Sequence, residues 1–175
     1  MVDTTKNTKV FTSYGVTTSR TVTPAVAAKM IAKAKRPLLV VGTAAAEQGL
    51  LERIISISRT LNLPIAATGS SMPAFVGKDV DARYINLHAL GFYLPDREWP
   101  GLDGNGSYDT LIVLGHKKYY INQVLSGLRN FSSIKTIAID RNYIQNASVS
   151  FGNLGKKEHI EALDELIGLL EAEAK

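Results

Sequence analysis

The sequence predicts an α/β fold, a Rossmann-like parallel sheet flanked by helices on both faces. Two observations predict it. Several short apolar runs lack the alternation of a half-exposed strand, which is typical of strands buried on both faces of a parallel sheet. These runs alternate along the chain with segments whose apolar residues recur at helical spacing, which is the order of consecutive β-α units.

The chain of 175 residues is expected to form one domain with an arm. Residues 1–22 are polar and rich in threonine, and their apolar residues show no helical period. We expect an extended N-terminal arm over 1–22 and a single Rossmann-like domain over 23–175. The arm packs on its own domain or on a partner, and a frayed terminus is the equally plausible alternative.

The first expected helix begins at Thr23, whose side chain suits the N-cap, followed by Pro24 at the first helical position. It is expected to end near Lys35. Its expected apolar face consists of Val26, Met30 and Ile31.

Two buried strands and a helix follow. Residues 37–42 and 64–69 are continuous apolar runs, and each ends at a glycine. The segment between them has apolar residues on one helical face. These residues are Leu50, Leu51, Ile54, Ile55 and Leu61.

The segment 70–108 interrupts this alternation with prolines, glycines and aromatic residues. We expect a short helix from about Asp81 to Leu90 and an otherwise irregular connection. A connection this long inside a compact domain is usually functional.

The alternation then resumes. Strands are expected over 110–114 and 134–139, with a possible further strand over 147–151. The helix between the first two has its apolar face at Ile121, Val124, Leu125 and Leu128. The apolar face of the final helix consists of Ile160, Leu163, Leu166, Ile167 and Leu170.

Composition excludes several classes of chemistry. The chain has no cysteine, so disulfides, cysteine nucleophiles and thiolate-ligated metals within these residues are ruled out. Its three histidines have no metal-ligand spacing, and we expect no metal to be bound by this chain. The net charge of +4 is scattered, which does not indicate nucleic acid. No membrane span or signal peptide is visible, so a cytoplasmic location is expected.

A ligand site is expected beyond the carboxyl ends of the strands, where open parallel sheets bind ligands. Glycines there allow a ligand to approach the backbone, although glycine also simply ends strands in such folds. The candidate cofactor-binding residues are Gly42, Thr43, Gly69, Ser70, Ser71, Gly115, His116, Asp140 and Arg141.

Three charged residues at the same strand ends each have two interpretations. Lys117 and Lys118 lie where a helix should begin, where cations oppose the helix dipole, so either a bound anion offsets that cost or both side chains reach solvent. Asp140 is placed to accept hydrogen bonds from a ribose, or it is a turn aspartate, which is the safer interpretation. No phosphate-binding loop, nucleophile elbow or acid–base pair is present, so no catalytic residue is assigned.

Six stretches together resemble one known family, the epsilon subunits of the archaeal acetyl-CoA decarbonylase/synthase complex. The likeness runs over nearly the whole chain, from the first residues onward. The stretches are Ala66–Pro73, Asp81–His88, Leu90–Leu94, Trp99–Gly106, Leu114–Leu125 and Ile139–Ala147.

The resemblance implies a fold, a partner and a cofactor. The fold is similar to the nucleotide-binding middle domain of thiamine-diphosphate enzymes, a DHS-like NAD/FAD-binding domain. The partner is the nickel–iron–sulfur alpha subunit of CO dehydrogenase in an alpha2epsilon2 type assembly, within a complex that reversibly cleaves acetyl-CoA. Residues Ile139–Arg141 match the position of an Ile-Asp turn near the cofactor in flavin-binding members of this fold, so FAD is a possible cofactor.

Two hypotheses follow from the resemblance. The first is an accessory, non-catalytic epsilon subunit that stabilises the alpha subunit and assists electron transfer to FAD. The alternative is a stand-alone flavin- or nucleotide-binding protein. Because the chain has no thiolate to offer, every metal cluster of such a complex must be ligated by its partners.

Overall fold

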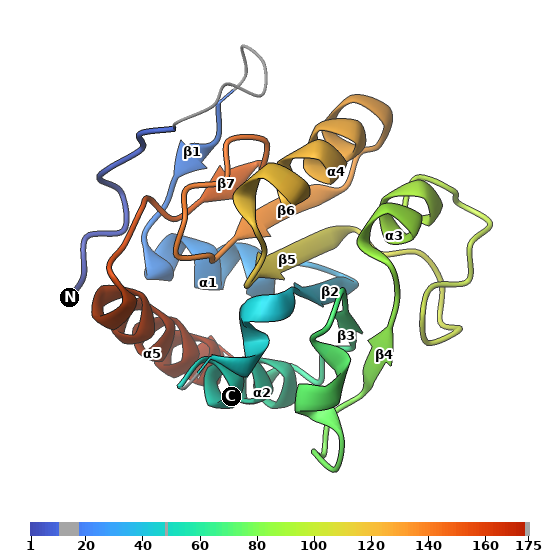
Figure 1. The fold of residues 1–175 in the computed structure, drawn as a ribbon, viewed down its shortest axis with the longest axis horizontal. Coiled ribbons are helices and arrows are strands. Elements are labelled where there is room, and N and C mark those ends of the chain that lie inside the picture. The colour runs from blue at the N-terminus through green and yellow to red at the C-terminus, as the bar shows by residue number, and fades with distance from the viewer. Residues whose placement is uncertain (11–17, 48, 174–175) are drawn as a thin grey trace.

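A computed structural model describes residues 1–10, 18–47 and 49–173 of the chain. Seven parallel strands form one sheet, with helices on both faces (Figure 1). The strands are β1 (Arg20–Thr21), β2 (Pro37–Val41), β3 (Ile65–Ala67), β4 (Ala82–Tyr84), β5 (Thr110–Leu114), β6 (Lys135–Ala138) and β7 (Val149–Ser150). The α-helices are α1 (Pro24–Ala32), α2 (Leu50–Thr60), α3 (Leu87–Tyr93), α4 (Lys118–Phe131) and α5 (Lys156–Glu173). Two 3-10 helices are η1 (Thr43–Ala46) and η2 (Met72–Phe75).

The strand order is β1-β7-β6-β5-β2-β3-β4. Without β1, this is the Rossmann order, in which the chain builds the sheet outward in one direction from β2 and then in the other from β5. The direction reverses between β2 and β5, which pair along five residues from Pro37 and Thr110 to Val41 and Leu114. The predicted α/β, Rossmann-like parallel sheet is therefore confirmed.

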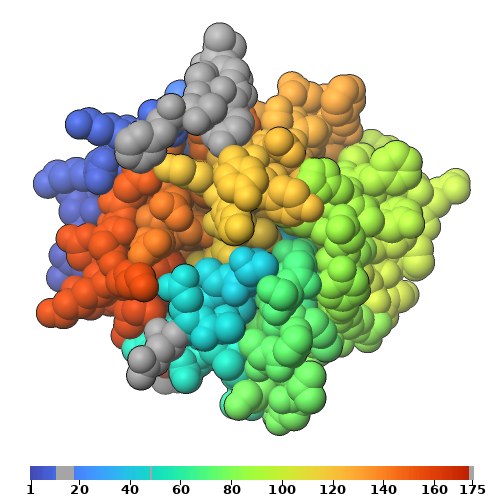
Figure 2. Space-filling model, viewed as in Figure 1, coloured from blue at the N-terminus to red at the C-terminus, as the bar shows by residue number. Residues whose placement is uncertain are grey.

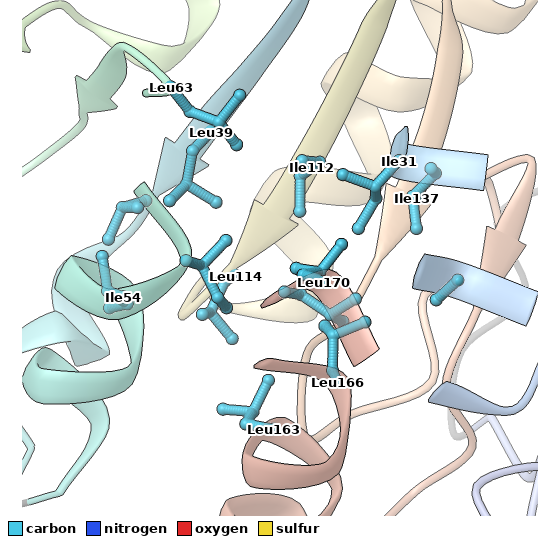
Figure 3. Packing of buried hydrophobic residues seen from close by; sticks show 14 of the residues in the cluster. Ile31, Leu39, Ile54, Leu63, Ile112, Leu114, Ile137, Leu163, Leu166 and Leu170 are labelled. Atoms are coloured by element: carbon cyan, nitrogen blue, oxygen red, sulfur yellow. The ribbon is translucent and has the colours of Figure 1, made fainter. Parts of the chain in front are cut away.

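Alternate residues of the central strands face two separate cores. Leu39 and Val41 on β2, and Ile112 and Leu114 on β5, pack with α1, α2 and α5 (Figure 3). Their strand neighbours Leu38, Val40, Leu111 and Val113 pack under α3 and α4 on the other face. Both faces of each strand are buried, which is why these segments are continuously apolar in the sequence.

The start of α1 is as predicted, and of its expected apolar face Ile31 is buried and Met30 packs against the core, while Val26 is not buried. Thr23 Oγ1 accepts a hydrogen bond from Val26 N at 3.3 Å, and Pro24 is the first helical residue. Val26 was expected on the apolar face, yet its side chain is 40% exposed. Ala27 and Ala28 are buried beside Ile31 in place of Val26, because small alanines allow the helix to lie close to the sheet and to α5.

The helix expected over 81–90 is displaced. Residues Ala82–Tyr84 pair with β3 as the edge strand β4, and the helix α3 runs from Leu87 to Tyr93. Asn86 fixes its start, because the Asn86 side-chain oxygen accepts hydrogen bonds from the backbone N–H groups of His88 and Ala89.

The N-terminal residues lie against the domain. Gly152 and Asn153 donate backbone hydrogen bonds to the carbonyl oxygens of Thr4 and Asn7, at 2.7 and 2.8 Å. The buried Thr4 hydroxyl donates to the Val22 carbonyl oxygen at 2.7 Å. Farther along, β1 joins the sheet beside β7, while residues 11–17 of the expected arm lie outside the described part of the chain.

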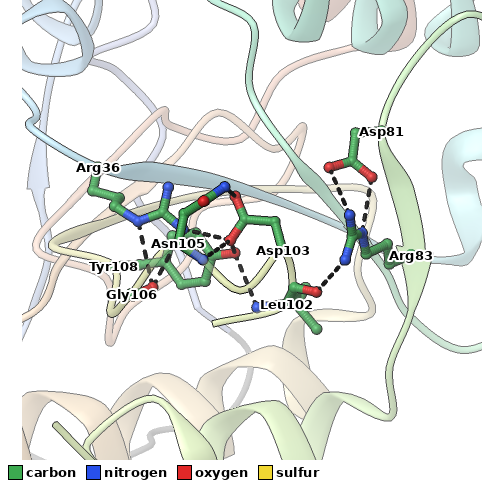
Figure 4. A network of polar contacts seen from close by, with 8 residues as sticks. All are labelled: Arg36, Asp81, Arg83, Leu102, Asp103, Asn105, Gly106 and Tyr108. Carbon is green, nitrogen blue, oxygen red and sulfur yellow. Dashed lines mark hydrogen bonds and ion pairs between the residues drawn. The ribbon is translucent and has the colours of Figure 1, made fainter. Parts of the chain in front are cut away.

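A polar network holds the 101–108 loop at the amino ends of β2 and β5 (Figure 4). Arg36 donates to the Asp103 carboxylate, which also accepts hydrogen bonds from Tyr108 and Asn105. Burial alone raises the pKa of Asp103, but these donors outweigh it and hold that pKa well below its usual range. The network lies at the edge of the sheet opposite to the strand ends where ligands bind, so we assign it a structural role.

Candidate functional site

A cavity of about 740 Å³ opens at the carboxyl edge of the sheet, beside the point where the strand order reverses. Its walls come from η1, from the turn between β5 and α4, from the residues after β6 and from the first turn of α5. The volume is within the range of small-molecule sites. The lining residues are Thr43, Ala44, Ala46, Glu47, Leu50, Gly115, His116, Lys117, Asp140, Arg141, Asn142, Lys156, His159 and Ile160.

Asp140 joins two strand ends within this wall. Its Oδ2 accepts hydrogen bonds from the N–H groups of Gly115 at 2.7 Å and His116 at 3.1 Å, and its Oδ1 accepts one from Asn142 N at 3.2 Å. Both carboxylate oxygens are therefore engaged by the backbone of the chain itself. The structure gives Asp140 the geometry of a turn aspartate, the safer of the two interpretations drawn from the sequence.

Backbone contacts close the sheet edge between β2 and β5, the switch point at which the strand order reverses. Ala44 N donates to Gly115 O at 3.0 Å and Gly42 N donates to Leu114 O at 2.9 Å, so η1 leans over the end of β5. A Cβ on Gly42 would lie 2.4 Å from Gly115 O, so only glycine permits this approach. The cavity consequently lies on the β6 and α5 side of that contact.

Two buried histidines line the cavity as neutral groups. His116 Nε2 is hydrogen-bonded to Thr68 Oγ1 at 3.1 Å, and His159 Nε2 lies 2.8 Å from the Ile139 carbonyl oxygen. Burial lowers the pKa of His116 to about 4, although the nearby Asp140 carboxylate acts in the opposite direction. Burial also lowers the pKa of His159. Neither imidazole is cationic at neutral pH.

The positive charge at the cavity comes instead from three longer side chains. Lys117 is the N-cap of α4, and it makes no side-chain capping hydrogen bond. Arg141 follows β6, and the Lys156 ammonium lies 3.9 Å from a Glu47 carboxylate oxygen. Lys117 and Lys118 thus lie at the predicted helix start. The three cations face the Glu47 and Asp140 carboxylates, so the lining has an excess of one positive charge (three minus two), which favours a ligand with negative charge.

The nine predicted cofactor residues divide into two groups. Thr43, Gly115, His116, Asp140 and Arg141 line the cavity. Gly42, Gly69, Ser70 and Ser71 do not line it. The buried Ser71 hydroxyl is used inside the fold, where it lies within hydrogen-bond distance of the Val41 and Thr68 carbonyl oxygens.

Sequence reasoning missed the part of the wall that comes from Glu47, just after η1, and from α5. Glu47, Lys156 and His159 line the cavity, and none of them follows a predicted strand directly. One feature of the sequence could have indicated this wall. The final helix follows the last strand after a short connection, so it must begin near the carboxyl edge of the sheet.

We expect the stability of the protein to fall as the pH drops from about 6.5 to about 4, because His116 is buried as the neutral imidazole. The unfolded chain binds a proton in that window and the folded chain does not, which removes about 3 kcal/mol of stability by pH 4. Chemical denaturation at several pH values measures this slope.

His116→Gln should remove a large part of the slope, and His159 accounts for some of the remainder because its pKa is lowered in the same direction. His88→Gln makes the same substitution at an exposed position on α3 and is the matched control for the substitution itself. A wild-type slope retained in His116→Gln would contradict the buried neutral imidazole.

Among the described residues, no group of three or more histidine, aspartate or glutamate side chains is arranged to hold a metal ion. No helix among those residues is long and apolar enough to cross a membrane.

Residues 8–167 match the protein family described as CO dehydrogenase beta subunit/acetyl-CoA synthase epsilon subunit. Three similar proteins carry the name acetyl-CoA decarbonylase/synthase complex subunit epsilon. Epsilon 1 of Methanosarcina barkeri is 68% identical over 97% of this chain and all of its own length. Epsilon 2 of Methanosarcina mazei is 66% identical over the same shares. Epsilon 1 of Archaeoglobus fulgidus is 40% identical over 83% of both chains.

Proposed function

Because the chain belongs to the family of acetyl-CoA decarbonylase/synthase epsilon subunits, we propose that it is a non-catalytic subunit that docks on the CO dehydrogenase alpha subunit. In this proposal it stabilises the alpha subunit in an alpha2epsilon2 type assembly. The observation that carries the proposal is the 66–68% identity, over 97% of this chain, to relatives named as complex subunits.

The chemistry of the chain supports an accessory role. It has no cysteine to ligate a nickel or iron–sulfur cluster, so those ligands must come from a partner. At the cavity, the Asp140 carboxylate accepts backbone N–H groups, and both histidines are hydrogen-bonded within the fold. These groups position the strand ends, and they leave no paired acid and base aimed at a substrate.

Light scattering after size-exclusion chromatography tests this proposal. Equimolar alpha subunit and this chain should elute together with the mass of two copies of each. The alpha subunit should also unfold at a higher temperature in the mixture than alone, because a partner that binds only the folded state stabilises it. Separate elution of the two chains would contradict the proposal.

The cavity favours flavin binding as a second candidate function. Lys117 and Arg141 fit the pyrophosphate of a dinucleotide and would hold it, with Lys156 at the far side of the cavity beside Glu47. The same residues do not fit ribose recognition by Asp140, because both carboxylate oxygens accept backbone hydrogen bonds. FAD, when bound, supplies one- and two-electron transfer chemistry.

A fluorescence titration of FAD with the purified chain tests this second candidate. Quenching that saturates, and that requires a higher protein concentration in Arg141→Ala, would support a site in the cavity. Lys29→Ala, which removes an exposed cation from α1 on another part of the surface, is the control. Unchanged flavin fluorescence at high protein concentration would reject flavin binding by the isolated chain.

A further inference from the structure

Aromatic side chains gather on the outer surface of α3 and α4. We call this surface the α3–α4 aromatic face and define it by His88, Phe92, Tyr119 and Tyr120. The Phe92 side chain is 81% exposed and that of Tyr119 is 53% exposed. Figure 2 shows the start of α4 and the light-green α3 next to each other on the displayed face.

The face is held in one arrangement by close helix packing. A Cβ on Gly91 would lie 2.6 Å from Val124 Cγ1, so glycine is required where α3 approaches α4. The His88 ring meets the Tyr120 ring edge to face at 4.6 Å, and Tyr119 meets Tyr120 at 6.5 Å. His88 and Phe92 are four residues apart, so they share one side of α3. Aromatic side chains have few rotatable bonds, so ordering them at an interface costs little conformational entropy.

Trp99 and Tyr108 of the 92–108 segment pack against the protein's own core, while Tyr93 is 43% exposed. Trp99 stacks on Tyr93 at 5.7 Å, and Tyr108 is buried beside Arg36. Leu94 is buried in the same core. Phe92 meets the edge of the Tyr93 ring at 6.1 Å, yet it stays 81% exposed, so it covers little of the chain's own apolar surface.

Charge distinguishes the two helix layers. No aspartate or glutamate occurs in α3 or α4, and α4 contains Lys118 and Arg129. On the opposite layer, α5 carries six carboxylates against two lysines. A partner surface that complements the α3–α4 layer therefore has an apolar centre and acidic residues around it.

We propose that the α3–α4 aromatic face is the docking surface for the alpha subunit, with Phe92 and Tyr119 as its central contacts. This inference rests on the proposed function, and it assigns the alpha subunit an apolar patch with an acidic rim. A second copy of this chain fits less well. Its acidic α5 would meet α3–α4 in a head-to-tail contact, which continues into a ring or a filament and does not close as a pair.

Surface plasmon resonance with immobilised alpha subunit tests the inference. The Phe92→Ala/Tyr119→Ala variant should bind with a dissociation constant at least tenfold above that of wild type, because exposed aromatics at an interface centre dominate binding. Val76→Ala is the matched control, since Val76 is 72% exposed and lies outside α3 and α4. Thermal melts of the variants should match wild type, which separates lost binding from lost folding.

Charge-reversal variants in the same binding experiment test whether the basic residues of α4 contribute to docking. Arg129→Glu on α4 should slow association with the alpha subunit, while Lys29→Glu on α1 makes the same charge change on the other layer and should not. Wild-type affinity in both the aromatic variant and Arg129→Glu would overturn the docking surface while leaving the proposed function intact. No binding by the wild-type chain would overturn both. Concentration-dependent self-association that the aromatic variant abolishes would assign the face to a second copy and overturn the inference.

Discussion

The Phe151→Ala variant is expected to have a free energy of unfolding about 4 kcal/mol below that of wild type. Phe151 directly follows β7, its side chain is completely buried, and it belongs to the core formed with α1, α2 and α5. Its backbone N–H also donates to Ala138 O on β6 at 2.9 Å, which holds it in place. Truncation therefore leaves a cavity that the neighbouring strands cannot easily fill.

Phe92→Ala provides the matched comparison, because it is the same substitution at a side chain that is 81% exposed. Its free energy of unfolding should stay within about 0.5 kcal/mol of wild type. Guanidinium denaturation of the three proteins measures both differences. Similar midpoints for Phe151→Ala and wild type would contradict the described core. A large loss in Phe92→Ala would make that residue structural and weaken its assignment to an interface.

Gly42→Ala is expected to destabilise the protein by about 3 kcal/mol, because it overpacks the contact at the switch point. The new Cβ would lie 2.4 Å from Gly115 O and 2.8 Å from His116 Cδ2, and the first of these is backbone that cannot rotate away. The ends of β2 and β5 must then separate, which breaks the hydrogen bond from Ala44 N to Gly115 O. The change should lower the melting temperature by about 6 to 12 °C.

Gly168→Ala is the control for Gly42→Ala. Gly168 lies inside α5, and no atom lies within 4 Å of the position a Cβ would take there. Alanine at a helical position of this kind should raise stability by about 0.5 to 1 kcal/mol. Differential scanning calorimetry of both variants measures the two opposite shifts. Equal melting temperatures for Gly42→Ala and wild type would show that the two strand ends are not in tight contact.

Most of the sheet could be predicted because its central strands are buried on both faces. Residues 37–41, 65–67, 110–114 and 135–138 are strands within the predicted runs, and the possible strand over 147–151 contains β7. Two strands were missed for a physical reason. β1 is two residues long, and β4 is a three-residue edge strand with exposed Arg83 and Tyr84, so neither produces a buried apolar run.

The candidate site could be predicted only in part, because strand ends mark an edge of the sheet and not the direction of each side chain. Arg141 and His116 line the cavity as expected from their positions after β6 and β5. Ser71 follows β3 in the same way, yet its hydroxyl turns back to the Val41 carbonyl oxygen. Lys156 and His159 reach the cavity from α5, and tertiary packing alone brings that helix there.

The cavity and the α3–α4 aromatic face begin at the same helix start. Lys117 lines the cavity as the N-cap of α4, and Tyr119 lies two residues later on the aromatic face. A partner seated on α3 and α4 would therefore lie close to the mouth of the cavity. This arrangement joins the two proposals, since a flavin bound in the cavity would be near the docked alpha subunit.

We propose above all that this chain works as a subunit bound to the CO dehydrogenase alpha subunit. The sharpest test is affinity purification of the tagged chain from native extract, with the bound proteins identified by mass spectrometry. We predict that the alpha subunit is recovered in a one-to-one ratio with the tagged chain, and that its recovery falls in the Phe92→Ala/Tyr119→Ala variant. Recovery of the wild-type chain without the alpha subunit would contradict the account.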